Sequence, residues 1–206
     1  MRIRVNNNNY QKIITRTRGF IRNYMKKLND ISHDYNHINL VFNLAVQIAK
    51  KEGITDERDL FHIKMASLLH DYEDSKYQSS NKNQAYMCDM YLRRNKNLKE
   101  ADRIEIVKIA SNISLSKDND ETCDDKNLKL MIVQDADRLN SLGSIGILRY
   151  ISYNLIAKKE KSFDEIIANI EKRTMKIRRF IRTKTGKAMA KKELSLVSRF
   201  INNYHQ

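Results

Sequence analysis

The stretch ASLLHDYEDSK, residues 66–76, places a histidine and an aspartate directly after an apolar run. The segment that leads into it becomes apolar nearly all round at MASLLHD, which is typical of a central, buried helix. Burying a carboxylate is costly unless a cation or a hydrogen-bond network compensates it. His70 and Asp71 are therefore the first candidates for a functional site.

The rest of the chain predicts an all-α protein in one domain. Among its 206 residues there is no proline and only five glycines, and strand-like alternation bounded by turn clusters is missing. The length favours a single domain over residues 1–206, with residues 1–14 expected to form a disordered N-terminal extension. We expect helices near residues 10–29, 34–52, 57–73, 82–95, 98–113, 127–141, 144–157, 163–182 and 186–203.

Cysteine usage and hydropathy indicate a cytoplasmic protein. The two cysteines are too few for a disulfide framework, which points to a reducing compartment. No apolar run approaches the 18 residues of a membrane span, and no signal-like apolar block follows the basic N-terminus. We therefore expect no membrane partner.

The net charge of +14 invites a nucleic-acid interpretation, but its distribution argues against one. Residues 1–30 carry eight basic residues against one acidic residue, and residues 158–192 carry thirteen against four. The stretch 31–157 is nearly neutral, with seventeen against nineteen. Solvated basic faces explain this pattern slightly better than dedicated polynucleotide binding, so a nucleic-acid partner is not favoured.

Further polar residues in apolar surroundings indicate a metal site. These are His37, in a helical pattern, and Asp135 and Asp137, which follow the apolar run LKLMIV. A lone histidine of this kind is most often a satisfied core residue, but buried acids at two separate places are harder to explain without a cation. Imidazole and carboxylate together suit Mn, Mg, Fe, Ni or Zn. Asp135 and Asp137 lie about 200° apart around a helix, so only one should face the ion.

Four strings in order resemble a known family. They are SHDYNHINLV (32–41), LLHDYEDSKY (68–77), VQDADRLNSLGSIGILR (133–149) and the tail RTKTGKAMA (182–190) with FINNY (200–204). Together they resemble the HD superfamily of metal-dependent phosphohydrolases, and within it a group of small single-domain hydrolases of bacterial type. The resemblance extends from about residue 15 to the C-terminus and implies one helical bundle of roughly eight to nine helices.

The resemblance also implies roles for individual residues. Metal ligands would be His37, His70, Asp71 and Asp137, with Asp135 as the alternative to Asp137. Asp74 and Lys76 would be catalytic, and His33, Lys76, Arg138 and Arg149 would contact the substrate. Two positions depart from the group: Leu40 stands where an arginine is usual, and Asn140 where the group has a second aspartate.

The function that this resemblance implies is metal-dependent hydrolysis of a small phosphorylated metabolite, most plausibly a nucleotide. Because some relatives are nucleoside triphosphate pyrophosphohydrolases, release of pyrophosphate is the first expectation. A phosphodiesterase or 5′-nucleotidase of the same superfamily is one alternative. Superfamily members that hydrolyse alarmones have an acidic pair soon after the His-Asp doublet, and Glu73–Asp74 is similar to it, although the spacing from the doublet is one residue shorter. The other alternative is a basic nucleic-acid-binding protein on an HD scaffold. The sequence does not indicate an oligomeric state.

Overall fold

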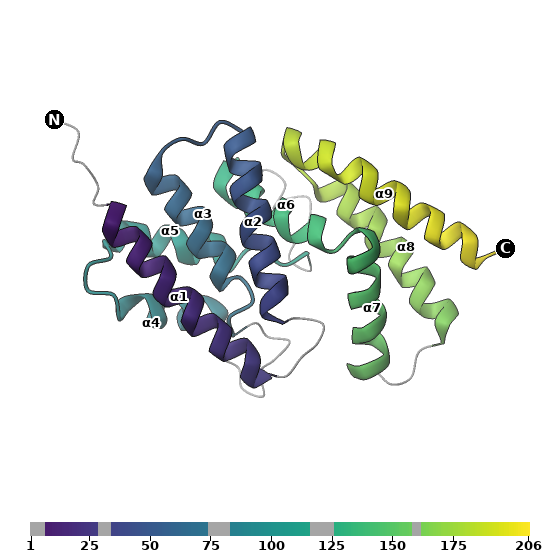
Figure 1. Cartoon of the computed structure of the whole chain (residues 1–206), viewed down its shortest axis with the longest axis horizontal. Helices are drawn as coiled ribbons and strands as arrows, with labels where there is room; N and C mark the ends of the chain where they lie inside the picture. Colours follow the sequence, from purple (N-terminus) through teal and green to yellow (C-terminus); the bar gives the residue numbers. More distant parts are fainter. Residues whose placement is uncertain (1–6, 29–33, 74–82, 116–125, 158–161) are drawn as a thin grey trace.

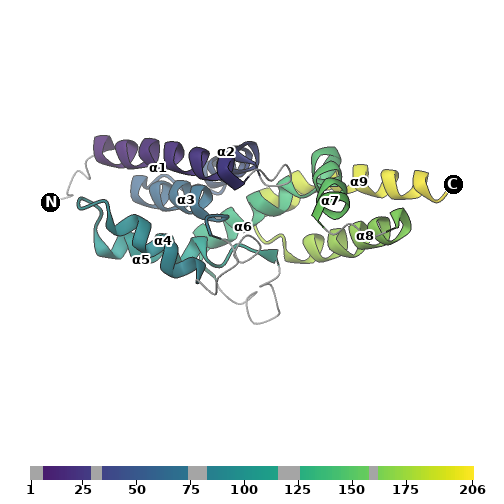
Figure 2. The same cartoon turned by 90° about the horizontal axis from the view of Figure 1, so that it is seen from below.

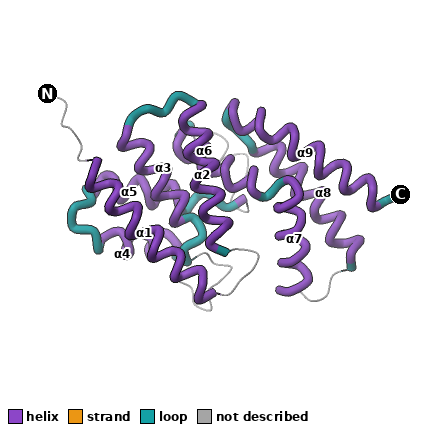
Figure 3. The backbone as a smooth tube through the Cα atoms, viewed as in Figure 1, coloured by secondary structure: helices purple, strands orange, loops and turns teal. Residues whose placement is uncertain are grey.

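The all-α prediction is confirmed. The computed structural model describes residues 7–28, 34–73, 83–115, 126–157 and 162–206, and within these ranges it holds helices, turns and loops but no strand (Figure 3). Each expected helix is present, with ends within four residues of those expected. No helix in these ranges is both long and apolar enough to cross a bilayer. The helices are α1 (Asn7–Leu28), α2 (Tyr35–Lys51), α3 (Glu57–Leu69), α4 (Gln84–Arg93), α5 (Glu100–Ala110), α6 (Leu128–Asn140), α7 (Gly143–Ala157), α8 (Phe163–Phe180) and α9 (Lys184–Tyr204).

The helices divide into two groups along the long axis of the molecule (Figure 1). Helices α1 to α6 form the larger group, in which α3 lies between α1 on one side and α4 and α5 on the other (Figure 2). Helix α3 packs against α1, α2, α5 and α6, and its residues from Phe61 to Leu69 are buried except for Lys64. This is the central, buried helix that the sequence predicts.

Helices α7, α8 and α9 form the second group and have a small core of their own. Its members are all aliphatic: Ile147, Ile166, Ile167, Ile170, Val197 and Ile201. The start of α8 is fixed by a capping box, in which Ser162 and Glu165 satisfy each other's backbone N–H groups. Helix α6 contacts α2 and α3 in the first group and α7 and α9 in the second, so it joins the two.

The N-terminal extension is shorter than the sequence suggests. Helix α1 begins at Asn7, and Tyr10, Ile13 and Ile14 are buried. The Tyr10 ring stacks on Phe61 with its centroid 4.0 Å away. The expectation of disorder is therefore wrong for residues 7–14, because this turn buries apolar surface against α3. Residues 1–6 lie outside the described residues.

A buried polar network connects α3, α5 and α6 on the side of α3 away from its C-terminal end. His62 Nε2 lies 2.8 Å from Asp102 Oδ1, and Asp102 is only 1% exposed. Arg58 donates to the same carboxylate oxygen, and the Lys129 ammonium lies 3.4 Å from His62 Nδ1. Lys129 also pairs with Asp59 and Glu105. Each polar group buried here has a charged or hydrogen-bonding partner, which makes its burial tolerable.

This network should make stability depend on pH. Burial lowers the pKa of His62, and the Lys129 ammonium acts in the same direction against the raising effect of Asp102. Because the folded state then binds fewer protons than the unfolded state, the free energy of unfolding is greatest above the ordinary pKa of about 6.5 and falls as the pH drops below it. We expect His62→Gln to reduce this loss, measured by urea unfolding at pH 7.5 and pH 5.5.

The exposed His205 provides the matched control for this prediction. His205→Gln should leave the pH dependence as in the wild type. An equal loss of stability in His62→Gln and wild-type protein would show that His62 contributes nothing to it.

Candidate metal centre

The His-Asp doublet lies in a turn at the end of α3. Helix α3 ends at Leu69, His70 is its C-cap, and Glu73 adopts a left-handed backbone conformation with φ 53°. A helix cannot continue through such a residue, so the predicted extension of this helix to residue 73 is wrong. The Tyr24 hydroxyl accepts from the Glu73 backbone N–H at 3.3 Å and holds the turn.

Three residues predicted for the site lie outside the described residues. They are His33, Asp74 and Lys76. Their predicted roles stay predictions from the sequence.

His37 and His70 are oriented by backbone groups nearby. Asp34 caps α2 by accepting from the His37 backbone N–H at 3.0 Å, which places His37 in the first turn of the helix. His70 Nδ1 lies 2.8 Å from the Ser67 carbonyl oxygen and must donate to it. The lone pair of His70 is therefore on Nε2, which faces His37. Metal-binding histidines commonly have their tautomer fixed in this way, by a hydrogen bond from the other ring nitrogen.

Four side chains converge from three parts of the chain. His37 Nε2 lies 3.1 Å from His70 Nε2 and 3.2 Å from Asp71 Oδ2, and His70 Nε2 lies 3.5 Å from that same oxygen. Asp137 Oδ1, from α6, lies 3.5 Å from His37 Nε2 and 3.8 Å from His70 Nε2. The ligand atoms of His37, His70 and Asp137 all lie within 4.8 Å of one another.

The separations among His37, His70 and Asp137 fit a single divalent cation. Ligand atoms that each lie about 2.0–2.2 Å from one ion are about 3 to 3.5 Å apart, close to the distances between these nitrogens and oxygens. Two imidazoles and two carboxylates also match the donors that Mn, Fe, Ni and Zn accept. The residues therefore fit the metal that the sequence predicts, while the choice among these ions stays open.

Burial keeps His37 neutral. His37 is 3% exposed, and this burial lowers its pKa to about 4, although the neighbouring Asp71 carboxylate acts in the opposite direction. A neutral imidazole keeps a lone pair for a cation, so the site is suited to metal binding at neutral pH.

Two further residues contact the outer nitrogen of His37. Arg149 NH1, from α7, lies 2.8 Å from His37 Nδ1, and Asn140 Nδ2, from the last turn of α6, lies 3.0 Å from it. Arg149 was predicted to contact the substrate, and the structure brings it to the metal centre. Asn140 received no role from the sequence, although its spacing of three from Asp137 places both on one face of α6.

Asp135 and Arg138 point elsewhere. Asp135 is fully buried and accepts from the backbone N–H groups of Arg182 and Thr183 and from the Thr183 hydroxyl, at 2.7 to 3.3 Å. Arg138 is 1% exposed and donates to the Phe180 carbonyl oxygen at 2.7 Å. Both side chains therefore hold α6 against the α8–α9 connection. The predicted contact of Arg138 with substrate does not fit a side chain so deeply buried.

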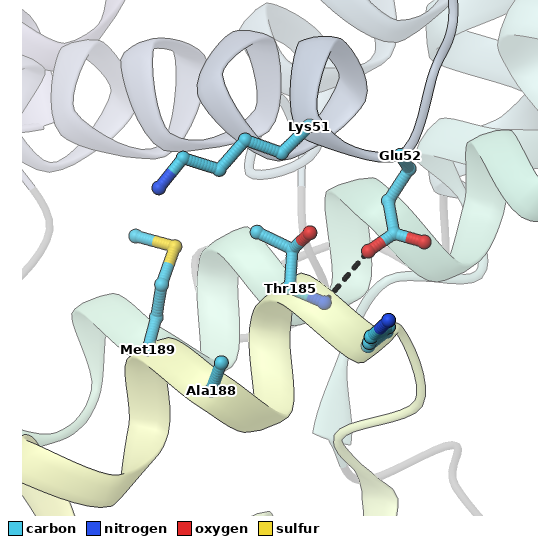
Figure 4. Close-up of a pocket in the computed structure, with 6 residues that line it drawn as sticks. Lys51, Glu52, Thr185, Ala188 and Met189 are labelled. Carbon is cyan, nitrogen blue, oxygen red and sulfur yellow. Dashed lines mark hydrogen bonds between the residues drawn. The ribbon is translucent and has the colours of Figure 1, made fainter.

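A separate hollow lies between the end of α2 and the start of α9. It has a volume of about 550 Å³ and is lined by Lys51, Glu52, Lys184, Thr185, Ala188 and Met189. In Figure 4 the Glu52 carboxylate accepts from the Thr185 backbone N–H, at 2.6 Å. Lys51 is fourteen residues beyond His37 on the same helix, or about 20 Å away, so this hollow is not part of the metal centre.

Comparison with known proteins agrees with the fold. An HD-superfamily hydrolase from Bacillus thuringiensis is 25% identical, with a TM-score of 0.72 over 95% of this chain and 96% of that one. Bacillus subtilis YpgQ, solved in complex with ADP, is 23% identical, with a TM-score of 0.74 over 93% and 95%. The uncharacterized protein L803 of Acanthamoeba polyphaga mimivirus is 30% identical over 143 residues, which are 65% of this chain and 58% of L803. No family model matches the chain.

The all-α bundle gathers two histidines and Asp137 from α2, the α3 turn and α6 into a group that could hold a metal ion, with Asp71 beside His37. With its similarity to solved HD-superfamily hydrolases over nearly its whole length, the chain has the fold that its sequence implied, that of the HD hydrolases.

Proposed function

We propose that this HD-superfamily enzyme hydrolyses a nucleoside triphosphate to the monophosphate and pyrophosphate. The observation that carries the proposal is the convergence of His37, His70, Asp71 and Asp137 with an arginine, Arg149, in one partly accessible site. The ADP complex of the structurally similar YpgQ supports a nucleotide as the ligand class. The sequence strings support the pyrophosphohydrolase group in particular.

The residues would have separate roles in metal binding, phosphate binding and proton transfer. His37, His70, Asp71 and Asp137 would hold the divalent cation, which when bound polarises a phosphoryl oxygen and activates water. The Arg149 guanidinium would bind phosphate oxygens in a bidentate manner and neutralise charge that builds on them. Asp74 would accept the proton of the attacking water, and Lys76 and His33 would contact phosphate, on the argument from the sequence. A reducing, cytoplasmic location fits Cys88, whose buried thiol donates to the Leu69 carbonyl oxygen at 3.8 Å.

The test begins with metal content. Protein purified without chelators is analysed for bound metals, stripped, and reconstituted with Mn²⁺. Nucleoside mono-, di- and triphosphates are then screened with separate detection of orthophosphate and pyrophosphate. Pyrophosphate from a triphosphate is the expected product. Orthophosphate from monophosphates alone would indicate a 5′-nucleotidase instead, and hydrolysis of a phosphodiester alone would indicate a phosphodiesterase.

The basic surface of α8 and α9 allows a prediction about nucleic acid. The two helices expose Lys172, Arg178, Arg179, Lys184, Lys187, Lys191, Lys192 and Arg199. If these side chains serve as solvated faces, affinity for random DNA or RNA should be weak at about 150 mM salt, with a dissociation constant near 10⁻⁴ M. Fluorescence anisotropy over a salt series measures it. Submicromolar binding with a steep salt dependence would favour a nucleic-acid-binding function.

A further inference from the structure

The two histidines of the metal centre carry their ring protons on different nitrogens. A neutral imidazole has one N–H and one lone pair, and its contacts determine which nitrogen holds each. His70 Nδ1 lies 2.8 Å from the Ser67 carbonyl oxygen, which can only accept, so this nitrogen carries the hydrogen. The lone pair of His70 is then on Nε2, which faces the centre. His70 is ready to bind a cation.

His37 has the opposite arrangement. Its Nδ1 is contacted at 2.8 Å by the Arg149 guanidinium, which has no acceptor and can only donate. The Asn140 amide nitrogen also lies 3.0 Å from His37 Nδ1 and 3.4 Å from the His37 carbonyl oxygen. His37 Nδ1 therefore carries the lone pair. The hydrogen is on Nε2, which lies 3.2 Å from Asp71 Oδ2.

This arrangement is incompatible with a cation bound to both rings. A cation needs the lone pair of His37 Nε2, so Nε2 must release its proton to solvent and Nδ1 must take one up. Once Nδ1 carries a hydrogen, Arg149 can no longer donate to it. Asn140 can accept that hydrogen by turning its amide so that the oxygen faces the ring.

We infer that Arg149 and the divalent cation compete for His37, so that metal binding displaces the Arg149 guanidinium and releases it for the phosphate of the substrate. Arg149 is then a positioning residue for His37 before the cation binds and a substrate ligand afterwards. Binding is ordered, with the metal before the nucleotide. The inference rests on the proposed function for the presence of metal and phosphate, but the competition itself is a property of His37, Arg149 and Asn140.

The first experiment measures metal affinity. Arg149→Leu, stripped of metal, should bind Mn²⁺ about tenfold more tightly than wild-type protein in isothermal titration calorimetry, because a hydrogen bond from a charged donor no longer competes. The KM of the variant for a triphosphate should rise. The control is Arg173→Leu, which removes an arginine that donates to Ser141 Oγ at 3.2 Å, and should change neither value. Salt at about 0.3 M screens the long-range effect of the lost charge.

Unchanged or weaker Mn²⁺ binding by Arg149→Leu would overturn the inference. An equal gain in Mn²⁺ affinity in Arg173→Leu would also overturn it, because the loss of any positive charge would then be enough to explain tighter binding. Asn140→Asp provides a second route if Arg149→Leu fails to fold. An aspartate can only accept, so it should draw the ring hydrogen to His37 Nδ1 and also tighten Mn²⁺ binding.

The second experiment observes the ring protons directly. In ¹⁵N NMR of metal-free protein at pH 7.5, His37 should be the Nε2–H tautomer and His70 the Nδ1–H tautomer. Adding Zn²⁺ should convert His37 to the Nδ1–H tautomer and leave the tautomer of His70 unchanged. His62, which pairs with Asp102 outside the centre, provides the internal reference. An Nδ1–H tautomer of His37 before metal is added would overturn the inference. Failure of wild-type protein to take up any ion would overturn the proposed function as well. The tautomer of His37 before Zn²⁺ is added tests the Arg149 contact independently of the proposed function.

Discussion

Replacing Asp137 by asparagine is expected to abolish stoichiometric metal binding and to lower turnover by about 10³-fold or more. The carboxylate oxygen of Asp137 lies 3.5 and 3.8 Å from the two histidine Nε2 atoms, and it is one of two negative charges that would compensate the cation. A bound metal contributes several kcal/mol to transition-state stabilisation, and each 1.36 kcal/mol is tenfold in rate. Metal analysis and turnover on the same preparation measure both effects.

Asp135→Asn is the matched control, two residues away on the same helix. Its carboxylate accepts from backbone N–H groups and a hydroxyl at the start of α9, and the amide of asparagine would place a donor against one of these donors. We expect a loss of about 1–3 kcal/mol in the free energy of unfolding, with bound metal retained. The reverse outcome, metal lost in Asp135→Asn and kept in Asp137→Asn, would make Asp135 the ligand.

The contrast between these two acids shows how far the sequence could predict the site. Helical periodicity alone indicates that Asp135 and Asp137 face different directions. Which of them faces the metal follows from the packing of α6 between α2 and the α8–α9 connection, which brings together residues more than 40 positions apart. Gly186 is part of this packing, because a Cβ there would overlap the Asp135 carboxylate. A single sequence contains no measure of such a contact; the family resemblance supplied the assignment.

Dependence on tertiary contacts also explains the other differences between the sequence predictions and the structure. The ends of α3 and α1 depend on tertiary contacts, namely the Tyr24 hydroxyl on the Glu73 turn and the Tyr10 ring on Phe61. Arg138 belongs to a string that the family resemblance links to substrate, yet its guanidinium donates to the end of α8. Local pattern predicted the helices well, because their apolar stripes and N-caps are local properties. Long polar side chains were predicted least well, because they reach partners far along the chain.

The metal centre also lies where the two groups of helices meet. His37, His70 and Asp71 belong to the first group, Asp137 to the joining helix α6, and Arg149 to α7 of the second group. Asp135 and Arg138 tie α6 to the α8–α9 connection, so they fix the second group relative to the metal ligands. Loosening that connection should therefore disturb the position of Arg149 more than the ligand set. Leu40, where the family resemblance leads us to expect an arginine, is 44% exposed on α2. Among the described residues, Arg149 is an arginine that does reach His37.

Asp74→Asn is expected to lower turnover by roughly 10²–10⁴-fold while the bound metal is retained. This acid follows the His-Asp doublet by three residues in the sequence, at a position where the family resemblance implies a catalytic residue. A general base contributes an effect of this size, and asparagine cannot accept the proton of the attacking water. Because His37, His70, Asp71 and Asp137 remain, metal content and the KM should change far less than kcat.

Glu73→Gln is the control for this prediction, since it removes a charge from the neighbouring position. Glu73 turns at φ 53° and its backbone N–H donates to Tyr24, and both features survive the change to glutamine. Full turnover in Glu73→Gln together with the loss in Asp74→Asn would assign the proton transfer to Asp74. Equal losses in the two variants would favour the acidic pair of an alarmone-type hydrolase, and unchanged turnover in Asp74→Asn would exclude it as the base. Loss of metal in Asp74→Asn would make it a ligand, with water activation left to another group.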